Sequence, residues 1–467
     1  MEFDKSPNLK YQAATVNSAK ENCGNPQKFY IELIKVFFLQ KKIAESAKIF
    51  PVMIVNRDKY LQELVSSRHN GLVKIITGMR RCGKSFLLFR LFKRFLEDDG
   101  VMPDHIIEMA FDDYAFKEFR NPDKFYKYVK EKIADDQPYY ILLDEVQMLG
   151  EFEDVLNGLL HIPNADVYVT GSNARFLSKD IITEFRGRGY QIHVSPLSFA
   201  EFMTVYDGDK QDGWNEYLLY GGLPPVVLQK TEEEKVRLLN SLLTETYMID
   251  VINRNKIKND AELNDLFKIL ASGIGGLTNP QRLANTFQSV KNVSISSATI
   301  KKYIEYLADA FLLEPCNRYD VKGRKYIGTP LKYYFSDLGI RNALLGFRQQ
   351  EKTHLMENAI YNELRYRGYS VDIGNVEING VDEKGTKVRR MLEVDFVCNQ
   401  GYKRCYIQSA LSLPDKEKTK QELASLLRID DSFMKYVITG DLIKKYQNDD
   451  GIVFMDVFDF LLDKDSI

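Results

Sequence analysis

The sequence predicts an α/β fold built on a mainly parallel sheet, followed by helical and α+β regions. Three observations support this. Short apolar runs alternate with helical stretches over residues 52–198, a glycine-containing loop joins the first run to a helix, and 467 residues exceed one ordinary core. Strands buried on both faces of a parallel sheet are expected to be short continuous apolar runs. We therefore predict a first domain at 52–198 with this architecture.

The apolar runs of this domain define five expected strands, at residues 72–77, 105–111, 139–143, 166–170 and 191–194. Between the first two, residues 85–96 repeat apolar side chains at helical spacing: Leu87, Leu88, Leu91, Phe92 and Phe95. Alternating strands and helices are typical of a doubly covered sheet.

Four further regions complete the expected organisation. Residues 1–51 form an N-terminal extension, partly disordered, and residues 199–256 a helical linker or lid. Residues 257–336 read as helices, one of them capped by a serine near 294–296, followed by a hairpin that turns near 322–324; this pattern favours a winged-helix domain. The remainder, 337–467, is expected to be a separate α+β unit.

The composition excludes several classes of protein. Lys and Arg total 64 against 66 for Asp and Glu, a net charge of −2, so any nucleic-acid binding must come from a local patch. The five cysteines are scattered with no C-x-x-C pair, which argues against a zinc site or a disulfide framework. No secretory signal opens the chain, and no apolar run approaches the ~20 residues of a membrane span. We expect a cytoplasmic protein without a membrane partner.

The strongest motif is a phosphate-binding loop. Residues Gly78–Ser85 match G-x-x-x-x-G-K-[ST] in full, between an expected strand and an expected helix. The glycines let the backbone curl so that N–H groups and the helix N-terminus face phosphates. We expect ATP to bind here, with the lysine at the β- and γ-phosphates and the serine hydroxyl on Mg²⁺. The binding residues are Gly78, Met79, Arg80, Arg81, Cys82, Gly83, Lys84, Ser85 and Phe86.

Catalytic candidates follow the later strands. The strand at 139–143 ends in Asp144, a candidate Mg²⁺ ligand with Ser85, and Glu145, a candidate general base for the attacking water. Asn173, with Ser172 as second choice, is a candidate contact to the γ-phosphate or the attacking water; the alternative is a simple turn.

Two arginines near the fifth strand are further candidates. Arg186 or Arg188 is expected to stabilise transition-state charge, either within the chain or from a neighbouring subunit, unless it is ordinary solvated surface. An arginine acting on a neighbour would make the active species an oligomer.

Together these residues resemble prokaryotic AAA-type ATPases of the archaeal branch that carry a C-terminal domain of unknown function. The resemblance runs from about residue 52 to the end, through the stretches 76–85, 143–147, 170–174, 186–188, 220–224, 334–339 and 393–396. It implies a P-loop NTPase domain of the AAA type, a winged helix, and a C-terminal domain similar to PD-(D/E)XK nucleases.

The resemblance to that nuclease fold also implies a site. Glu357 fits its helix acid and Asp395 its strand aspartate, but the third element begins at Gln408, where the expected acid is replaced by a neutral side chain and the expected lysine by alanine. Glu393, two residues before Asp395 on the same strand face, is an alternative ligand. We expect a degenerate site and a binding or assembly role.

The winged-helix region is a candidate DNA surface. Its basic residues are Lys301, Lys302, Arg318, Lys322, Arg324, Lys325 and Lys332. These charges would favour contact with phosphates, whereas many winged helices contact proteins instead. DNA, a protein partner and self-association all stay open.

Three functions are therefore compatible with the sequence. The leading one is an Mg²⁺-dependent ATPase whose nucleotide state rearranges the winged-helix and C-terminal domains. The alternatives are an ATP-bound signalling or scaffold switch with little turnover, and an ATP-dependent DNA nuclease.

Overall fold

The computed structural model describes residues 54–171, 187–348, 351–381 and 387–467. The expected N-terminal extension at 1–51 lies outside these residues. The described chain forms one compact unit from Val55 to Ile467 that contains two β-sheets.

The first sheet has five parallel strands in the order β2-β3-β4-β1-β5. Their bounds are β1 Val73–Thr77, β2 Ile106–Ala110, β3 Tyr139–Asp144, β4 Ala165–Thr170 and β5 Gly189–His193. These agree with the five strands expected from the sequence, and the parallel sheet is confirmed. Every residue of β1 and β3 is buried, as a sheet covered on both faces requires.

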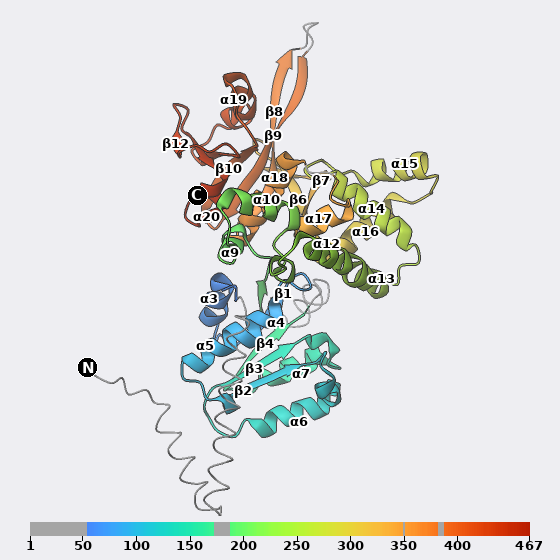
Figure 1. The fold of residues 1–467 in the computed structure, drawn as a ribbon, viewed down its shortest axis with the longest axis vertical. Coiled ribbons are helices and arrows are strands. Elements are labelled where there is room, and N and C mark those ends of the chain that lie inside the picture. The colour runs from blue at the N-terminus through green and yellow to red at the C-terminus, as the bar shows by residue number, and fades with distance from the viewer. Residues whose placement is uncertain (1–53, 172–186, 349–350, 382–386) are drawn as a thin grey trace, which may run out of the picture. The chain divides into compact units, whose positions relative to one another are not determined.

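Helices cover both faces of this sheet (Figure 1). Adjacent strand residues point to opposite sides, so Ile76 packs in the core with Leu88 and Phe92, whereas Ile75 packs in the core with Leu156. The helices are α3 Asp58–Ser66, α6 Pro122–Lys132, α7 Phe152–Leu159 and a continuous run of α4 Lys84–Phe86, a π-helical segment Leu87–Phe92 and α5 Lys93–Asp98.

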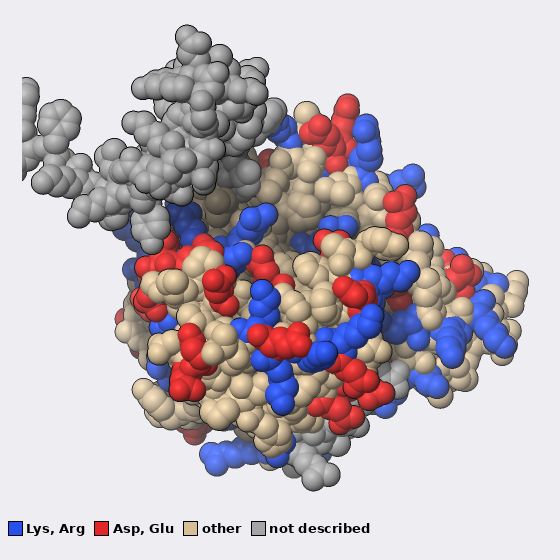
Figure 2. Space-filling model, turned by 90° about the horizontal axis from the view of Figure 1, so that it is seen from below, with Lys and Arg blue, Asp and Glu red and all other residues tan. Residues whose placement is uncertain are grey.

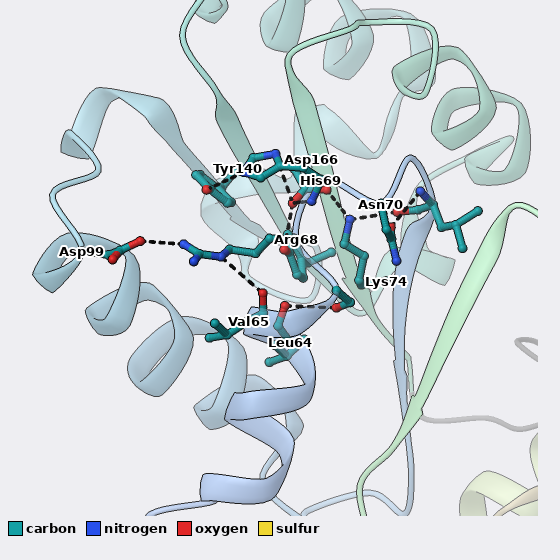
Figure 3. A network of polar contacts seen from close by, with 12 residues as sticks. Leu64, Val65, Arg68, His69, Asn70, Lys74, Asp99, Tyr140 and Asp166 are labelled. Atoms are coloured by element: carbon teal, nitrogen blue, oxygen red, sulfur yellow. Dashed lines mark hydrogen bonds and ion pairs between the residues drawn. The ribbon is translucent and has the colours of Figure 1, made fainter. Parts of the chain in front are cut away.

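A polar network lies at the amino-terminal ends of β1, β3 and β4, at the opposite end of β1 from the P-loop (Figure 3). Lys74 and Asp166 form an ion pair, and Asp166 also accepts hydrogen bonds from the Tyr168 hydroxyl at 2.8 Å and the His69 amide at 3.1 Å. The His69 ring contacts the Tyr140 hydroxyl at 2.9 Å. Burial lowers the pKa of Lys74 despite this partner. The network joins the loop after α3 to β3 and β4.

The middle of the described chain is helical, as expected. Its helices are α9 Phe199–Met203, α10 Lys210–Tyr220, α11 Pro224–Val227, α12 Glu232–Ser241, a π-helical segment Leu242–Met248, α13 Ile249–Asn255, α14 Asp260–Ser272, α15 Pro280–Lys291 and α16 Ser297–Asp309. Ser296 caps α16, because its Oγ accepts the Thr299 amide at 3.0 Å. No described helix is long and apolar enough to cross a bilayer.

The second sheet has eight strands in the order β12-β13-β11-β10-β9-β8-β6-β7. Their bounds are β6 Leu313–Asp320, β7 Lys325–Phe335, β8 Ser370–Val381, β9 Lys387–Gln400, β10 Lys403–Ala410, β11 Met434–Thr439, β12 Tyr446–Gln447 and β13 Ile452–Asp456. The helices of this part are α17 Leu338–Leu344, α18 Lys352–Tyr366, α19 Lys416–Leu423 and α20 Val457–Leu462. The β8–β9 hairpin extends beyond the other strands (Figure 1).

The hairpin β6–β7 corrects the expected domain boundary. It pairs through β6 with β8, in parallel register from Arg318–Ile373 to Asp320–Asn375. The hairpin expected as the wing of a domain at 257–336 is therefore part of the sheet formed by the strands of 337–467. Local patterns mark strands, but they carry no information about pairing between strands far apart in the chain.

The surface carries both signs of charge. Figure 2 shows lysine and arginine side chains interspersed with aspartate and glutamate on one face, in line with the net charge of −2. No extended region of one sign dominates that face.

Candidate functional site: the P-loop and its surroundings

The P-loop joins β1 to α4 and needs glycine at two positions. Gly78 has φ 140° and Gly83 has φ 100°, in a region that other residues rarely adopt. A Cβ atom at Gly78 would also collide with the carbonyl oxygen of Val194. Only glycine at position 78 is therefore compatible with the curled backbone that the motif predicts.

Lys84 lies within this curl. Its side chain is buried, and Nζ donates hydrogen bonds to the carbonyl oxygens of Gly78 and Met79, both at 3.0 Å. The ammonium thus lies beside the backbone of the loop, at the start of the helix.

Ser85 and Asp144 come together at the carboxyl edge of the sheet. Asp144 ends β3, is 5% exposed, and accepts a hydrogen bond from the Thr170 hydroxyl, while the nearby Ser85 hydroxyl acts to lower its pKa. Burial raises the pKa of Asp144 against the effect of both hydroxyls. A hydroxyl and a carboxylate are hard oxygen ligands, which fits Mg²⁺ bound by one or two protein groups together with phosphate.

Glu145 leaves the strand geometry directly after Asp144. Its φ of 51° is unusual for a non-glycine residue and breaks the alternation of the strand. The Glu145 amide donates to Thr170 Oγ1 at 3.2 Å, and its carboxylate accepts from Gln147 Nε2. Thr170, at the end of β4, is thus hydrogen-bonded to both acidic residues, a role that no local sequence signal indicated.

Helix α13 contributes charged groups to the same region. Asp250 pairs with Arg80 of the P-loop at 2.6 Å, and the Tyr247 hydroxyl donates to the Arg80 carbonyl at 2.9 Å. Burial lowers the pKa of Arg254, while Asp250 and Glu145 act to raise it. The charges of Arg254 and Glu145 therefore interact. Nothing local in the sequence marks Arg254, because it lies in a helix far along the chain.

These features agree with the sequence comparisons. The model of an AAA domain family matches residues 70–203, and that of a domain of unknown function (DUF8612) matches residues 211–351. A protein of Haemophilus influenzae, itself uncharacterized, is 32% identical over 415 residues, covering 88% of this chain and 99% of that protein. The chain belongs to this family of AAA-domain proteins.

A more distant relative covers a similar share of the chain, and two solved structures match over less of it. An uncharacterized protein of Methanocaldococcus jannaschii is 26% identical over 420 residues, covering 86% of this chain and 87% of that protein. Among solved structures, the Orc1 protein of Aeropyrum pernix in complex with DNA matches at 11% identity and a TM-score of 0.28, over 63% of this chain and 93% of that one. Cdc6p of Pyrobaculum aerophilum matches at 11% and 0.28, over 65% and 99%. The family assignment rests on the sequence matches alone.

The other candidate residues of the AAA domain are Ser172, Asn173, Arg186 and Arg188. Ser172, Asn173 and Arg186 lie outside the described residues. Arg188 is exposed and its carbonyl accepts the Val73 amide at 2.9 Å, at the start of β1. In a parallel sheet the start of β1 is at the edge opposite the P-loop, so Arg188 cannot reach the P-loop of its own chain.

A second group of charges surrounds Lys332 on β7. Lys332 is buried, and its Nζ lies 2.9 Å from Glu357 Oε1 and 2.6 Å from Glu393 Oε1. The Tyr334 hydroxyl also donates to Glu357 Oε1, at 2.7 Å. Burial opposes the charge of Lys332, but Glu357, Asp395 and Glu393 together raise its pKa. Lys332, which the sequence placed among the candidate DNA contacts, is therefore held in this charged cluster.

Asp395 belongs to this group, but Gln408 does not. Asp395 Oδ2 accepts the Ser409 amide at 2.7 Å, and burial followed by the charge of Glu357 raises the pKa of Asp395 well above its usual value. Gln408 instead donates to Glu422 of α19 at 3.2 Å, on the sheet face away from α18. The expected Glu357–Asp395–Gln408 site is therefore corrected to Glu357, Asp395, Glu393 and Lys332.

A β-bulge explains why simple alternation along the sequence does not predict which sheet face these side chains occupy. Between the pairs Asp372–Val397 and Gly374–Val394, β9 contains one residue more than β8. The extra residue changes which side chains share a face. Among the described residues, no group of three or more His, Cys, Asp or Glu side chains is arranged to hold a metal ion.

The candidate DNA residues divide into two sets. Lys301, Lys302, Lys322, Arg324 and Lys325 are exposed on α16 and at the β6–β7 turn. By contrast, Arg318 is hydrogen-bonded to Asn375 at 2.6 Å, and Lys332 is buried in the cluster above. Only the first set is accessible to a phosphate backbone.

Proposed function

We propose that this AAA-domain protein binds ATP at its P-loop and hydrolyses it with Mg²⁺. The observation that carries the proposal is the curled loop with Lys84 Nζ held on the Gly78 and Met79 carbonyls, next to Ser85, whose hydroxyl acts on the pKa of Asp144 at the end of β3. When bound, Mg²⁺ neutralises charge on the β- and γ-phosphates. Ser85 and Asp144 are the residues that would hold it.

The other groups of the site have separable roles. Lys84 exchanges its hydrogen bonds with the loop carbonyls for the β- and γ-phosphates, and the loop amides bind the same oxygens. Glu145 accepts a proton from the attacking water as general base. Gln147 and Thr170 hold Glu145 through the hydrogen bonds described above.

Arg254 is the arginine that we propose to act in cis. The charge of Glu145 acts on its pKa, and Arg254 lies one helical turn after Asp250, which pairs with Arg80 of the P-loop. Arg188 remains a candidate only for the active site of a neighbouring subunit, which would require an oligomer. The pairing of Arg80 with Asp250 further links the P-loop to α13, so nucleotide binding can alter the arrangement of the helices beyond the AAA domain.

Titration calorimetry and phosphate release test the proposal. We expect Mg²⁺-ATP to bind the wild type, Lys84→Ala to lose binding, and Glu145→Gln to bind ATP while losing hydrolysis. An absence of heat with wild type overturns ATP binding. Hydrolysis at the wild-type rate by Glu145→Gln overturns the assignment of the base.

The rate of turnover decides between two versions of this function. An ATPase that drives rearrangement releases phosphate continuously, whereas a signalling or scaffold switch binds ATP tightly and turns over only a few times per hour. Measuring steady-state phosphate release beside single-turnover hydrolysis separates them, because only the switch retains bound nucleotide across the assay.

For the C-terminal sheet we propose a structural ion cluster in place of a nuclease site. The ammonium of Lys332 neutralises the carboxylates that a metal ion would otherwise bind. Incubation with duplex DNA and Mg²⁺ is expected to give no cleavage. Cleavage that disappears in Asp395→Ala would contradict this proposal.

A further inference from the structure

Arg57 joins three parts of the AAA domain through one buried side chain. It precedes α3 and is 3% exposed. Its Nη1 donates to the carbonyl oxygen of Cys82 at 3.1 Å, and its Nη2 donates to that of Ser195 at 2.6 Å. Its Nε lies 3.1 Å from Glu201 Oε1. A planar guanidinium with five N–H donors can serve acceptors in three directions, whereas a lysine ammonium cannot reproduce this fork.

The contact with Cys82 bears directly on the phosphate-binding backbone. In a trans peptide, the C=O of Cys82 and the N–H of Gly83 point in opposite directions. Fixing this carbonyl against Arg57 therefore also fixes the Gly83 amide, which opens helix α4. Amides at the start of a helix are the groups that bind phosphate oxygens. Arg57 thus holds one of the donors in its orientation.

The surroundings of Arg57 keep it charged. Burial opposes the charge, but Glu201 and the Tyr60 hydroxyl raise the pKa of Arg57 above its ordinary value, and the guanidinium also lies 4.8 Å from the Tyr60 ring centre. The Tyr60 hydroxyl in turn accepts the Ser195 amide at 3.0 Å. A buried charge without such partners would be costly. The arginine, its counter-ion and the ring therefore form one fixed unit.

The same unit reaches helix α18. Glu201 Oε1 accepts a hydrogen bond from the hydroxyl of Tyr366, the last residue of α18, at 3.3 Å. Glu201 Oε2 accepts the Ser198 amide at 3.0 Å, which holds the carboxylate in place. Tyr366 also packs edge-on against Tyr60 with ring centres 5.8 Å apart. A line of contacts thus runs from the P-loop to α18.

A cleft lies beside this line. It is lined by Met79 of the P-loop and by Asn362 and Tyr366 of α18. Tyr366 lines this cleft, so the polar contacts that run from Arg57 through Glu201 end at its margin.

We propose that Arg57 positions the P-loop backbone for nucleotide and, through Glu201 and Tyr366, links nucleotide occupancy to helix α18. This inference rests on the proposed binding of ATP. The link is reciprocal: if ATP changes the state of α18, a change at the end of α18 alters ATP affinity by the same factor.

The first experiment separates positioning from simple stability. ATP affinity is measured by calorimetry with Mg²⁺ for the wild type, Arg57→Gln, Arg57→Lys and the control Arg68→Lys, well below the unfolding temperature of each. Arg68 is a suitable control because its ion pair with Asp99 is exposed and lies outside the line of contacts. Circular dichroism establishes that each variant is folded.

Loss of a charged hydrogen bond predicts ATP binding roughly 10- to 100-fold weaker in Arg57→Gln. Arg57→Lys is expected to recover part of the loss, because it keeps the charge but not the fork, and Arg68→Lys is expected to match the wild type. A folded Arg57→Gln that binds ATP like the wild type overturns the positioning role. If Arg57→Gln does not fold, Arg57→Lys serves in its place, and wild-type affinity in that variant has the same consequence.

The second experiment follows α18 directly. Hydrogen exchange of the α18 amides is measured with and without Mg²⁺-ATP in the wild type and in Tyr366→Phe, which removes one hydroxyl. We expect ATP to slow exchange at the end of α18 in the wild type, and this effect to be lost in Tyr366→Phe while ATP still binds. An ATP effect that is absent in the wild type, or unchanged in Tyr366→Phe, overturns the link. If wild type does not bind ATP at all, the proposed function itself fails, which the first titration reveals.

Discussion

Replacing Lys332 by methionine removes the positive charge from the cluster on β7 and keeps a side chain of similar length. The change leaves Glu357 buried with the hydrogen bond from Tyr334 and with His354 at 3.6 Å, but without the ammonium 2.9 Å away. Removing one partner of a buried ion pair costs about 3–5 kcal/mol. Because the Glu393 side chain is 35% exposed and can regain water, we expect the lower end, about 3 kcal/mol.

The pH dependence of this loss has a defined sign. In the wild type the pKa of Lys332 is raised, so its contribution is fully present below the unfolded value of ~10.4 and is lost only as pH rises through the folded value. In the wild type the pKa of Glu357 is lowered: burial raises it, but His354, Lys332 and Tyr334 lower it by more, and Lys332→Met removes one of these groups, so its folded pKa rises relative to the wild type. The folded variant then binds more protons at Glu357 than the folded wild type. Its stability deficit is expected to shrink as pH falls from about 8 to about 5.

Urea unfolding followed by tryptophan fluorescence measures this deficit. Trp214 is the only tryptophan, and it packs edge-on against Phe458 at 6.4 Å in the core that also contains α18. Lys93→Met is the control, because the Lys93–Glu108 pair at 2.9 Å is partly exposed and is worth less than ~1 kcal/mol. A Lys332→Met variant with the urea midpoint of the wild type, or a deficit that grows on acidification, would refute the cluster as a source of stability.

Three further substitutions test other parts of the structure. Gly78→Ala is expected to abolish ATP binding in calorimetry, since φ 140° and the Val194 carbonyl leave no room for a Cβ; retained affinity would contradict the geometry of the loop. Arg254→Ala is expected to lower kcat at least tenfold with a small change in ATP affinity, and an unchanged kcat would remove Arg254 from the site. Lys74→Met is expected to lower the free energy of unfolding by about 3 kcal/mol, because Asp166 stays buried with neutral donors only, while ATP affinity measured in parallel is unchanged. A loss of ATP affinity in Lys74→Met would show that this network also affects nucleotide binding at the P-loop.

Much of the AAA domain was predictable because its signals are local. The P-loop is a contiguous motif. The strand before it is recognisable as a short apolar run, and the helix after it by the spacing of its apolar residues. The sequence predicted the five strands with bounds within one or two residues, because each is a short apolar run and β1 and β3 are buried throughout.

The sequence alone determined the P-loop with Lys84 and Ser85, and the acidic end of β3, which are encoded in consecutive residues. Only the tertiary structure decided that the β6–β7 hairpin joins the large sheet, that Lys332 forms an ion pair with Glu357, and that Arg57 donates a hydrogen bond to the carbonyl oxygen of Cys82. Each of these contacts joins residues on separate elements, and charged side chains have no periodicity that reveals a distant partner. A single additional residue in β9 was enough to change which side chains share a face with α18.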